Sequence, residues 1–196
     1  MKRRADAISR FPVPERADLP PDIAARLAEV EEKSGFVPNV FLALAHRPAE
    51  WRAFFAYHDA LMDTESPMLG KADRELIVVA TSAANGCLYC VVAHGAIARI
   101  RARDPRIADQ VAVDWRKADL TAAQLAMLDF ATRLAADPVT VTEHDTAVLA
   151  EHGFTRDDVW DIGSIVAFFA LSNRLVHVAA VPPNDEFYLL GRLPRS

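Results

Sequence analysis

Residues 75–94 read ELIVVATSAANGCLYCVVAH, and the predicted fold is built outward from this stretch. After Glu75 the chain is apolar for most of two helical turns, so a helix here would be buried on nearly all sides. Asn85 and Gly86 form a dipeptide that usually marks a turn or a helix boundary. Cys87 follows directly and opens a second apolar run. We therefore predict a buried helix hairpin that turns at Asn85-Gly86.

One part of this stretch is ambiguous. The run LIVV at residues 76–79 is rich in β-branched side chains and could form a strand. However, no segment of the chain alternates with period two for more than a few residues, glycine is scarce, and helix-capping signals recur at helical spacing. The predicted class is therefore all-α, a compact bundle of helices around the Cys-x-x-Cys hairpin.

The same signals predict further helices on both sides of the hairpin. Each is marked by apolar residues three and four apart and by a proline, glycine or capping residue at its ends. The predicted ranges are about 22–35, 40–47, 49–64, 104–113, 121–136 and 142–152, followed by a long apolar helix that Pro182 and Pro183 end.

Length and composition indicate one domain. The 196 residues are 52% apolar and 25% charged, which is ordinary for a globular protein. We expect a single helical domain over residues 1–196, with an extended proline-rich arm at 1–21 and a tail at 184–196. The formal net charge of -5 argues against a nucleic-acid partner, because phosphate binding needs a basic face.

The most apolar long stretch, residues 159–181, does not read as a membrane span. Polar residues interrupt it: Asp161, Asn173, Arg174 and His177. A helix buried in the core or in an oligomer interface is the better interpretation. With two cysteines and no visible export signal, we expect a cytoplasmic protein whose cysteine pair serves redox or metal chemistry.

The spacing of Cys87, Cys90 and His94 favours thiol chemistry. A thiol is nucleophilic only as thiolate, and a helix start stabilises an anion. On a helix, His94 lies one turn beyond Cys90 on the same face and could accept its proton. A sulfenic acid formed on one cysteine can be captured by the other as a disulfide. The pair therefore suits peroxide reduction or dithiol exchange.

Glu75 is expected to face His94. In an antiparallel hairpin, Glu75 lies about 15 Å from the turn and His94 about 11 Å, at 1.5 Å per residue. Their levels differ by less than one turn. A carboxylate beside His94 would orient the imidazole ring and raise its basicity, or pass a proton through a bound water.

The cysteine pair and Glu75 also fit other interpretations. A Cys-x-x-Cys pair can be half of a zinc site, but no second pair exists in the chain. A thioredoxin-like fold would need alternating strands and helices. Two inert buried cysteines remain an alternative, as does a purely electrostatic role for Glu75 at a helix start. For His46, His58, Arg174 and His177, packing or interface roles are favoured over catalysis.

The pattern E-x6-S-x2-N-x-C-x-Y-C-x3-H resembles the core motif of the alkylhydroperoxidase D-like members of the carboxymuconolactone decarboxylase superfamily. Its residues are Glu75, Ser82, Asn85, Cys87, Tyr89, Cys90 and His94. The segments GFVPN at 35–39, GFT at 153–155 and NR at 173–174 resemble the branch of peroxidase-related proteins, which extends the likeness to most of the chain.

This resemblance implies an all-α fold that forms trimers or hexamers. It also implies roles: Cys90 as the peroxidatic cysteine, Cys87 as the resolving cysteine, His94 as the base and Glu75 as the start of a proton relay. Some relatives carry a histidine where this chain has Tyr89, so the resemblance assigns that position no relay role. The true decarboxylases lack the cysteine pair, which argues against that activity.

The sequence therefore predicts a thiol-dependent peroxidase that reduces hydroperoxides without a cofactor or metal. Its partners would be a hydroperoxide, a thiol or dithiol electron donor, and further copies of the chain in a dimer, trimer or hexamer. Two alternatives stay open, a general dithiol-disulfide oxidoreductase and a non-enzymatic, redox-sensing oligomeric module.

Overall fold

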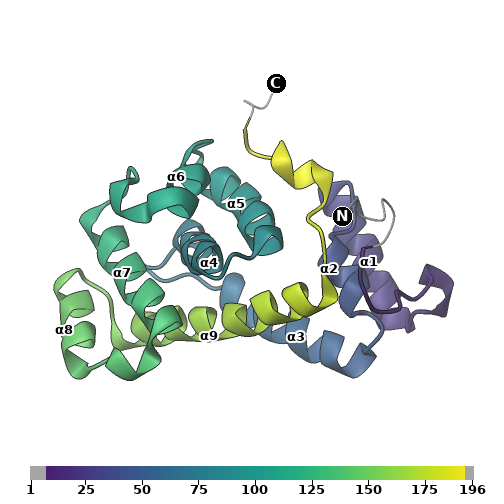
Figure 1. Ribbon diagram of the computed structural model, residues 1–196, viewed down its shortest axis with the longest axis horizontal. Helices are drawn as coiled ribbons and strands as arrows, with labels where there is room; N and C mark the ends of the chain where they lie inside the picture. The colour runs from purple at the N-terminus through teal and green to yellow at the C-terminus, as the bar shows by residue number, and fades with distance from the viewer. Residues whose placement is uncertain (1–7, 193–196) are drawn as a thin grey trace.

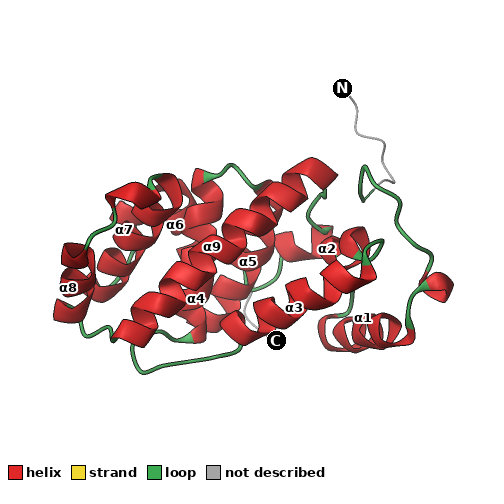
Figure 2. Cartoon of the chain, turned by 90° about the horizontal axis from the view of Figure 1, so that it is seen from below, coloured by secondary structure: helices red, strands yellow, loops and turns green. Residues whose placement is uncertain are grey.

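The computed structural model describes residues 8–192, and every regular element within them is a helix (Figures 1 and 2). The α-helices are α1 (Pro21–Ser34), α2 (Asn39–Leu44), α3 (Pro48–Met62), α4 (Lys71–Ala84), α5 (Leu88–Ala102), α6 (Ile107–Asp114), α7 (Ala122–Ala136), α8 (Glu143–Glu151) and α9 (Arg156–Ala179). Short 3-10 turns are η1 (Arg16–Asp18), η2 (Trp115–Lys117), η3 (Pro138–Thr140) and η4 (Asp185–Tyr188). The all-α prediction is confirmed.

Helix α4 lies at the centre of the bundle. Figure 1 shows it nearly end-on, with α5, α6, α7 and α9 around it, and it contacts all four. Every residue from Arg74 to Ser82 is buried. The β-branched run at 76–79 is helical, because a strand would need a hydrogen-bonded neighbour and the chain on either side folds into helices.

The turn between α4 and α5 caps the C-terminal end of α4 with backbone hydrogen bonds. Gly86 adopts φ +62°, the left-handed conformation that glycine adopts without steric cost. The Cys87 N–H donates to the Ser82 carbonyl at 2.9 Å, and the Gly86 N–H donates to the Ala83 carbonyl at 3.0 Å. These two bonds satisfy the last carbonyls of α4. They also fix Cys87 as the residue that immediately precedes α5.

Helix α9 supports the hairpin from one side. It begins at the Thr155 cap, whose hydroxyl accepts the Asp158 N–H at 3.1 Å, and its chain reverses at Ala180, which has φ +55°. By length and composition α9 could cross a membrane, but half of its most apolar window is buried inside the protein, as in a core helix. Its buried polar residues Ser172 and Asn173 face the hairpin.

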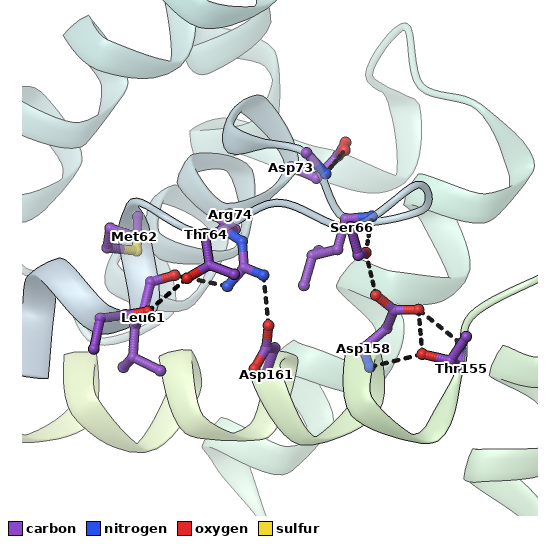
Figure 3. A network of polar contacts seen from close by, with 12 residues as sticks. Leu61, Met62, Thr64, Ser66, Asp73, Arg74, Thr155, Asp158 and Asp161 are labelled. Atoms are coloured by element: carbon purple, nitrogen blue, oxygen red, sulfur yellow. Dashed lines mark hydrogen bonds and ion pairs between the residues drawn. The ribbon is translucent and has the colours of Figure 1, made fainter.

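A polar network fastens the α3–α4 connection to α9 (Figure 3). Arg74 is fully buried, and its guanidinium donates to the Leu61 carbonyl at 2.6 Å and to the Asp161 carboxylate. The Ser66 hydroxyl donates to the carboxylate of Asp158. Because Arg74 precedes Glu75, this network also sets the position of Glu75 in the core.

The two ends of the described chain pack against the C-terminal ends of α9 and α5. In the expected arm, the Arg10 N–H donates to the Ala179 carbonyl at 2.8 Å. In the expected tail, Phe187 of η4 is buried, and the Arg99 guanidinium donates to its carbonyl at 2.9 Å. The remaining parts of arm and tail, residues 1–7 and 193–196, lie outside the described residues.

One predicted helix boundary was wrong. Pro105 was expected in the first turn of its helix, but α6 begins at Ile107. Arg103 adopts φ +57° and ends α5, and the Asp104 carboxylate accepts the Arg106 N–H at 2.8 Å. The aspartate therefore forms a local turn in which Pro105 lies outside the helix.

Candidate active site

The hairpin brings Glu75 of α4 and His94 of α5 into contact. Nδ1 of His94 lies 2.7 Å from Oε2 of Glu75. Glu75 is 1% exposed and the His94 side chain 12%. A carboxylate can only accept a hydrogen bond, so Nδ1 must carry the hydrogen that it donates to Glu75. In the neutral ring, Nε2 is then the nitrogen without hydrogen and can accept a proton. The two residues were predicted to differ in level along the hairpin by less than one turn, and this small difference allows the contact.

Arg101 is a second partner of Glu75 that the sequence analysis missed. Its Nη1 lies 3.2 Å from Oε1 of Glu75, and the side chain is 26% exposed. Arg101 follows His94 by seven residues, which is two helical turns, so both project from the same face of α5. That spacing was the available signal. A buried carboxylate is stabilised by a nearby positive charge, and Arg101 supplies it.

Aromatic rings cover the other sides of His94. Phe169 of α9 meets it edge to face, with ring centroids 4.7 Å apart. His58 of α3 approaches it with centroids 6.3 Å apart, so one of the two N-terminal histidines does reach the site. The other, His46, stacks on Phe11 instead. The His94 ring is therefore oriented by one carboxylate and held by apolar contacts.

The two cysteines lie at the start of α5, with Cys87 capping the helix and Cys90 in its first turn. Both thiols are free, and both residues are 1% exposed. Sγ of Cys90 lies 3.9 Å from the hydroxyl oxygen of Ser172, a residue whose role the sequence analysis missed. Cys90 contacts Ser172, whereas His94 contacts Glu75. Among the described residues, the helix face that Cys90 and His94 were predicted to share therefore produces no direct hydrogen bond between them.

The two thiols differ in acidity. The pKa of Cys87 is lowered to about 7, first by a hydrogen bond from the Cys90 thiol, and further by backbone N–H groups of the first turn and the charge of His177. The pKa of Cys90 is raised well above its ordinary value, because this thiol donates to Cys87 and is deeply buried. The hydrogen bond between the two sulfurs therefore favours the loss of one proton from the pair.

A ladder of polar side chains joins the hairpin turn to α9. The Asn85 amide donates to Oδ1 of Asn173 at 2.9 Å, and the Asn173 amide donates to the Ser82 hydroxyl at 3.0 Å. Nε2 of His177 lies 3.2 Å from the Asn85 carbonyl. Polar residues in an apolar helix were the visible signal for this ladder, but their partners were not predictable from spacing.

A cavity of about 870 Å³ opens beside the hairpin turn. It is lined by residues 8–10, Asn39, 86–89, 176–177 and 180–186. The lining includes Cys87 and His177, and among the described residues it does not include Cys90. The cavity therefore borders Cys87, although both cysteines are only 1% exposed.

Tyr89 has a structural role, because its side chain links two helices. Its hydroxyl accepts the Val40 N–H at 3.3 Å, the residue is buried, and burial raises the pKa of the phenol. The hydroxyl thus ties α5 to the start of α2. Arg174 is exposed and donates to the Ala170 carbonyl of its own helix. Within residues 8–192, no group of three or more His, Cys, Asp or Glu side chains is placed to hold a metal ion.

Comparisons with known proteins match this chain to peroxidase-related folds. Residues 48–133, which include Glu75, Cys87, Cys90 and His94, match the carboxymuconolactone decarboxylase family. The structure of an alkylhydroperoxidase AhpD core, an uncharacterized peroxidase-related protein from Ralstonia eutropha JMP134, is 60% identical. It superposes with a TM-score of 0.95 over 97% of this chain and 100% of that chain.

Two further structures show the range of the fold. An uncharacterized peroxidase-related protein from Silicibacter sp. TM1040 is 37% identical, with a TM-score of 0.90 over 96% of this chain and 98% of that one. The debrominase Bmp8 is 20% identical, with a TM-score of 0.74 over 95% and 96% of the two chains, and shares the fold. A search of curated proteins gave no match.

Proposed function

Because this chain belongs to the alkylhydroperoxidase D-like, peroxidase-related branch of the carboxymuconolactone decarboxylase superfamily, we propose that it is a thiol-dependent peroxidase acting through Cys87 and Cys90. The observation that carries the proposal is the placement of two free thiols at the start of α5, Cys87 immediately before the helix and Cys90 in its first turn. A thiolate is the form that attacks a peroxide, and a neighbouring thiol can resolve the sulfenic acid that results.

Glu75 and His94 supply the proton chemistry in this proposal. Glu75 holds the hydrogen at Nδ1, which leaves Nε2 of His94 as the nitrogen that can act as a base. Arg101 keeps a positive charge beside the buried carboxylate. A proton leaving the cysteine side of α5 would pass to His94, directly or through water, while Glu75 stabilises the charged ring.

The electron donor is proposed to be a small dithiol or a dithiol protein. The disulfide formed between Cys87 and Cys90 must be reduced once in each cycle, and thiol-disulfide exchange is the chemistry that does so. We expect the protein to work in the cytoplasm, where thiols are kept reduced.

The proposal is tested by steady-state consumption of hydrogen peroxide with dihydrolipoamide as the donor. The wild type should turn over many times, whereas Cys90→Ser and Cys87→Ser should each lose turnover, because the cycle needs both sulfurs. Ala84→Ser, which adds a hydroxyl to the exposed last residue of α4, provides a matched control and should keep full activity. Full activity in either cysteine variant would contradict the proposal.

The same experiment separates the two alternatives. A general dithiol-disulfide oxidoreductase would reduce insulin or oxidised lipoamide faster than it reduces peroxide. A redox sensor would be oxidised once, in proportion to its own concentration, and would show no turnover with donor present.

A further inference from the structure

His58 of α3 is a second imidazole beside the buried hairpin. Its ring centroid lies 6.3 Å from that of His94, and the ring planes are 49° apart. Phe169 contacts both rings, with its centroid 4.7 Å from that of His94 and 6.3 Å from that of His58. The His58 side chain is 28% exposed, whereas that of His94 is 12% exposed. Of the two neighbouring rings, His58 is therefore the one that solvent reaches more readily.

The polar partners of His58 repeat the arrangement at His94. Nδ1 of His58 lies 3.1 Å from Oδ1 of Asp59, and Nη2 of Arg26 donates to Oδ2 of the same carboxylate at 2.9 Å. The pKa of Asp59 is lowered, first by the hydrogen bond from His58 and also by the charge of Arg26. At His94 a carboxylate likewise holds Nδ1, and an arginine lies beside that carboxylate. Each neutral ring therefore has Nε2 as the nitrogen that can take up a proton.

The remaining neighbours of His58 are aromatic. Phe168 and Phe169 of α9 lie with their ring centroids 6.0 and 6.3 Å away, and Phe55 of α3 lies 6.4 Å away. The charged or titratable groups that face His58 from α3, α1 and α5 are Asp59, Arg26 and His94. A proton on Nε2 of His58 can therefore pass to His94 or to solvent.

The distance between the two histidines suits transfer through one water. A ring nitrogen lies about 1 Å from its centroid, so nitrogens on the facing edges are roughly 4 Å apart at the closest. That separation is too long for a direct hydrogen bond and is within the span of a single bridging water. The spacing is therefore that of two steps in one proton path.

We infer that His58 exchanges protons between His94 and solvent, and that Asp59 and Arg26 hold it in the orientation for this exchange. This inference rests on the proposed peroxidase function. It gives the buried Glu75–His94 pair a route to the surface. His58 acts through His94 and does not contact the reacting atoms, so it is a positioning residue.

The proton transfers balance over one turnover. The proton of the attacking thiol passes to His94 and through His58 to solvent, which leaves a thiolate. As the thiolate attacks the outer oxygen of the hydroperoxide, an S–O bond forms and the O–O bond breaks, and two electrons pass from sulfur to the peroxide. The leaving alkoxide takes a proton returned along the same route and becomes an alcohol. The second thiol then forms the S–S bond and releases water, and a dithiol donor restores two electrons and two protons.

The first test is the turnover of hydrogen peroxide by His58→Gln in weakly buffered solution with dihydrolipoamide as the donor. Glutamine is polar but does not carry a proton, so kcat should fall roughly tenfold while KM for peroxide stays unchanged. The loss is smaller than the roughly 100-fold typical of a group that contacts the reacting atoms, because solvent still reaches His94 slowly. His46→Gln, at the histidine that stacks on Phe11, is the matched control and should keep full activity. An unchanged kcat in His58→Gln would overturn the inference.

A second variant separates proton transfer from a purely structural role. His58→Ala removes the ring and leaves room for a free imidazole. Added imidazole should restore most of the lost turnover in His58→Ala, because it supplies the same acid–base group, and should not stimulate the wild type. Circular dichroism checks that the variant is folded. A loss of turnover in folded His58→Ala that imidazole does not restore would show that His58 only packs.

A third measurement needs no peroxide. The exchange of the His94 ring N–H with water is followed by NMR in the reduced wild type, in His58→Gln and in His46→Gln. The exchange should be several-fold slower in His58→Gln alone, because His58 is the group that hands this proton to solvent. Equal exchange rates in the three proteins would contradict the route.

These outcomes distinguish the inference from the proposed function. If the wild type turns over peroxide and His58→Gln matches it in both turnover and exchange, the route through His58 is wrong and the peroxidase proposal stands. If the wild type shows no turnover, the peroxidase proposal fails, and with it the part of the inference that concerns peroxide. Slower exchange in His58→Gln would then still establish the contact between the two histidines.

Discussion

At the scale of single residues, Glu75 is a buried carboxylate whose hydrogen-bond partners determine its role. It is 1% exposed, yet it has two partners, His94 at 2.7 Å and Arg101 at 3.2 Å. A charge in such a position is tolerated only when it is paired and hydrogen-bonded. Because one oxygen faces Arg101 and the other faces His94, the carboxylate fixes the imidazole ring in one orientation.

Glu75→Gln should therefore slow peroxide reduction while the fold is kept. The amide has the shape of the carboxylate but lacks the charge that stabilises protonated His94, so we expect a loss of roughly 10- to 100-fold in turnover. Steady-state assays with the circular dichroism spectrum as a check of folding would measure this. Glu151→Gln, at an exposed residue of α8, is the control. Unchanged turnover in Glu75→Gln would remove the glutamate from the mechanism.

At the scale of elements, the position of α4 depends on its polar fastening to α9. Arg74 is fully buried and has the Asp161 carboxylate as its charged partner, and Figure 3 shows the pair crossing from α4 to α9. The same helix start carries Glu75. The Arg74–Asp161 ion pair is therefore one of the polar contacts that hold the rotation of this buried helix, together with those of Glu75 and Ser82.

Asp161→Asn should lower the free energy of unfolding by about 2 to 3 kcal/mol, because it leaves a buried guanidinium without its counter-charge. This loss is smaller than the roughly 3 to 5 kcal/mol typical of a fully buried pair, because the Asp161 side chain is 29% exposed. Urea unfolding followed by circular dichroism measures the change. Asp157→Asn, at an exposed residue of the same helix, should cost less than about 1 kcal/mol. A double variant, Arg74→Met with Asp161→Leu, should recover part of the loss.

At the scale of the whole molecule, α3 and α9 leave an apolar groove of about 550 Å³ on the surface. Large apolar side chains are exposed along it, including Tyr57, Leu171 and Val178, each about half exposed. Apolar groups in this density favour burial against another surface. We expect a second copy of the chain to occupy the groove, so that the protein is a homo-oligomer.

Light scattering after size exclusion should give a mass of two, three or six chains. Leu171→Lys and Val178→Lys should each shift the protein towards the monomer, because a charge would be buried at the contact. Val113→Lys, at an exposed residue outside the groove, should leave the mass unchanged. A monomeric wild type would contradict the expectation, and an oligomer unaffected by both groove variants would place the contact elsewhere.

The sequence by itself determined the helical class, the hairpin turn at Gly86 and the contact between Glu75 and His94. These depend on local rules: apolar periodicity, a left-handed glycine, and distances from one turn that differ by less than a helical turn. Only the tertiary structure decided which groups surround the two thiols. Ser172, Asn173 and His177 lie some 80 to 90 residues along the chain from Cys87 and Cys90, as the numbering shows. Helix spacing fixes the face from which a side chain projects, but the docking of α9 and the cavity beside Cys87 arise from long-range packing, and these make the two cysteines unequal.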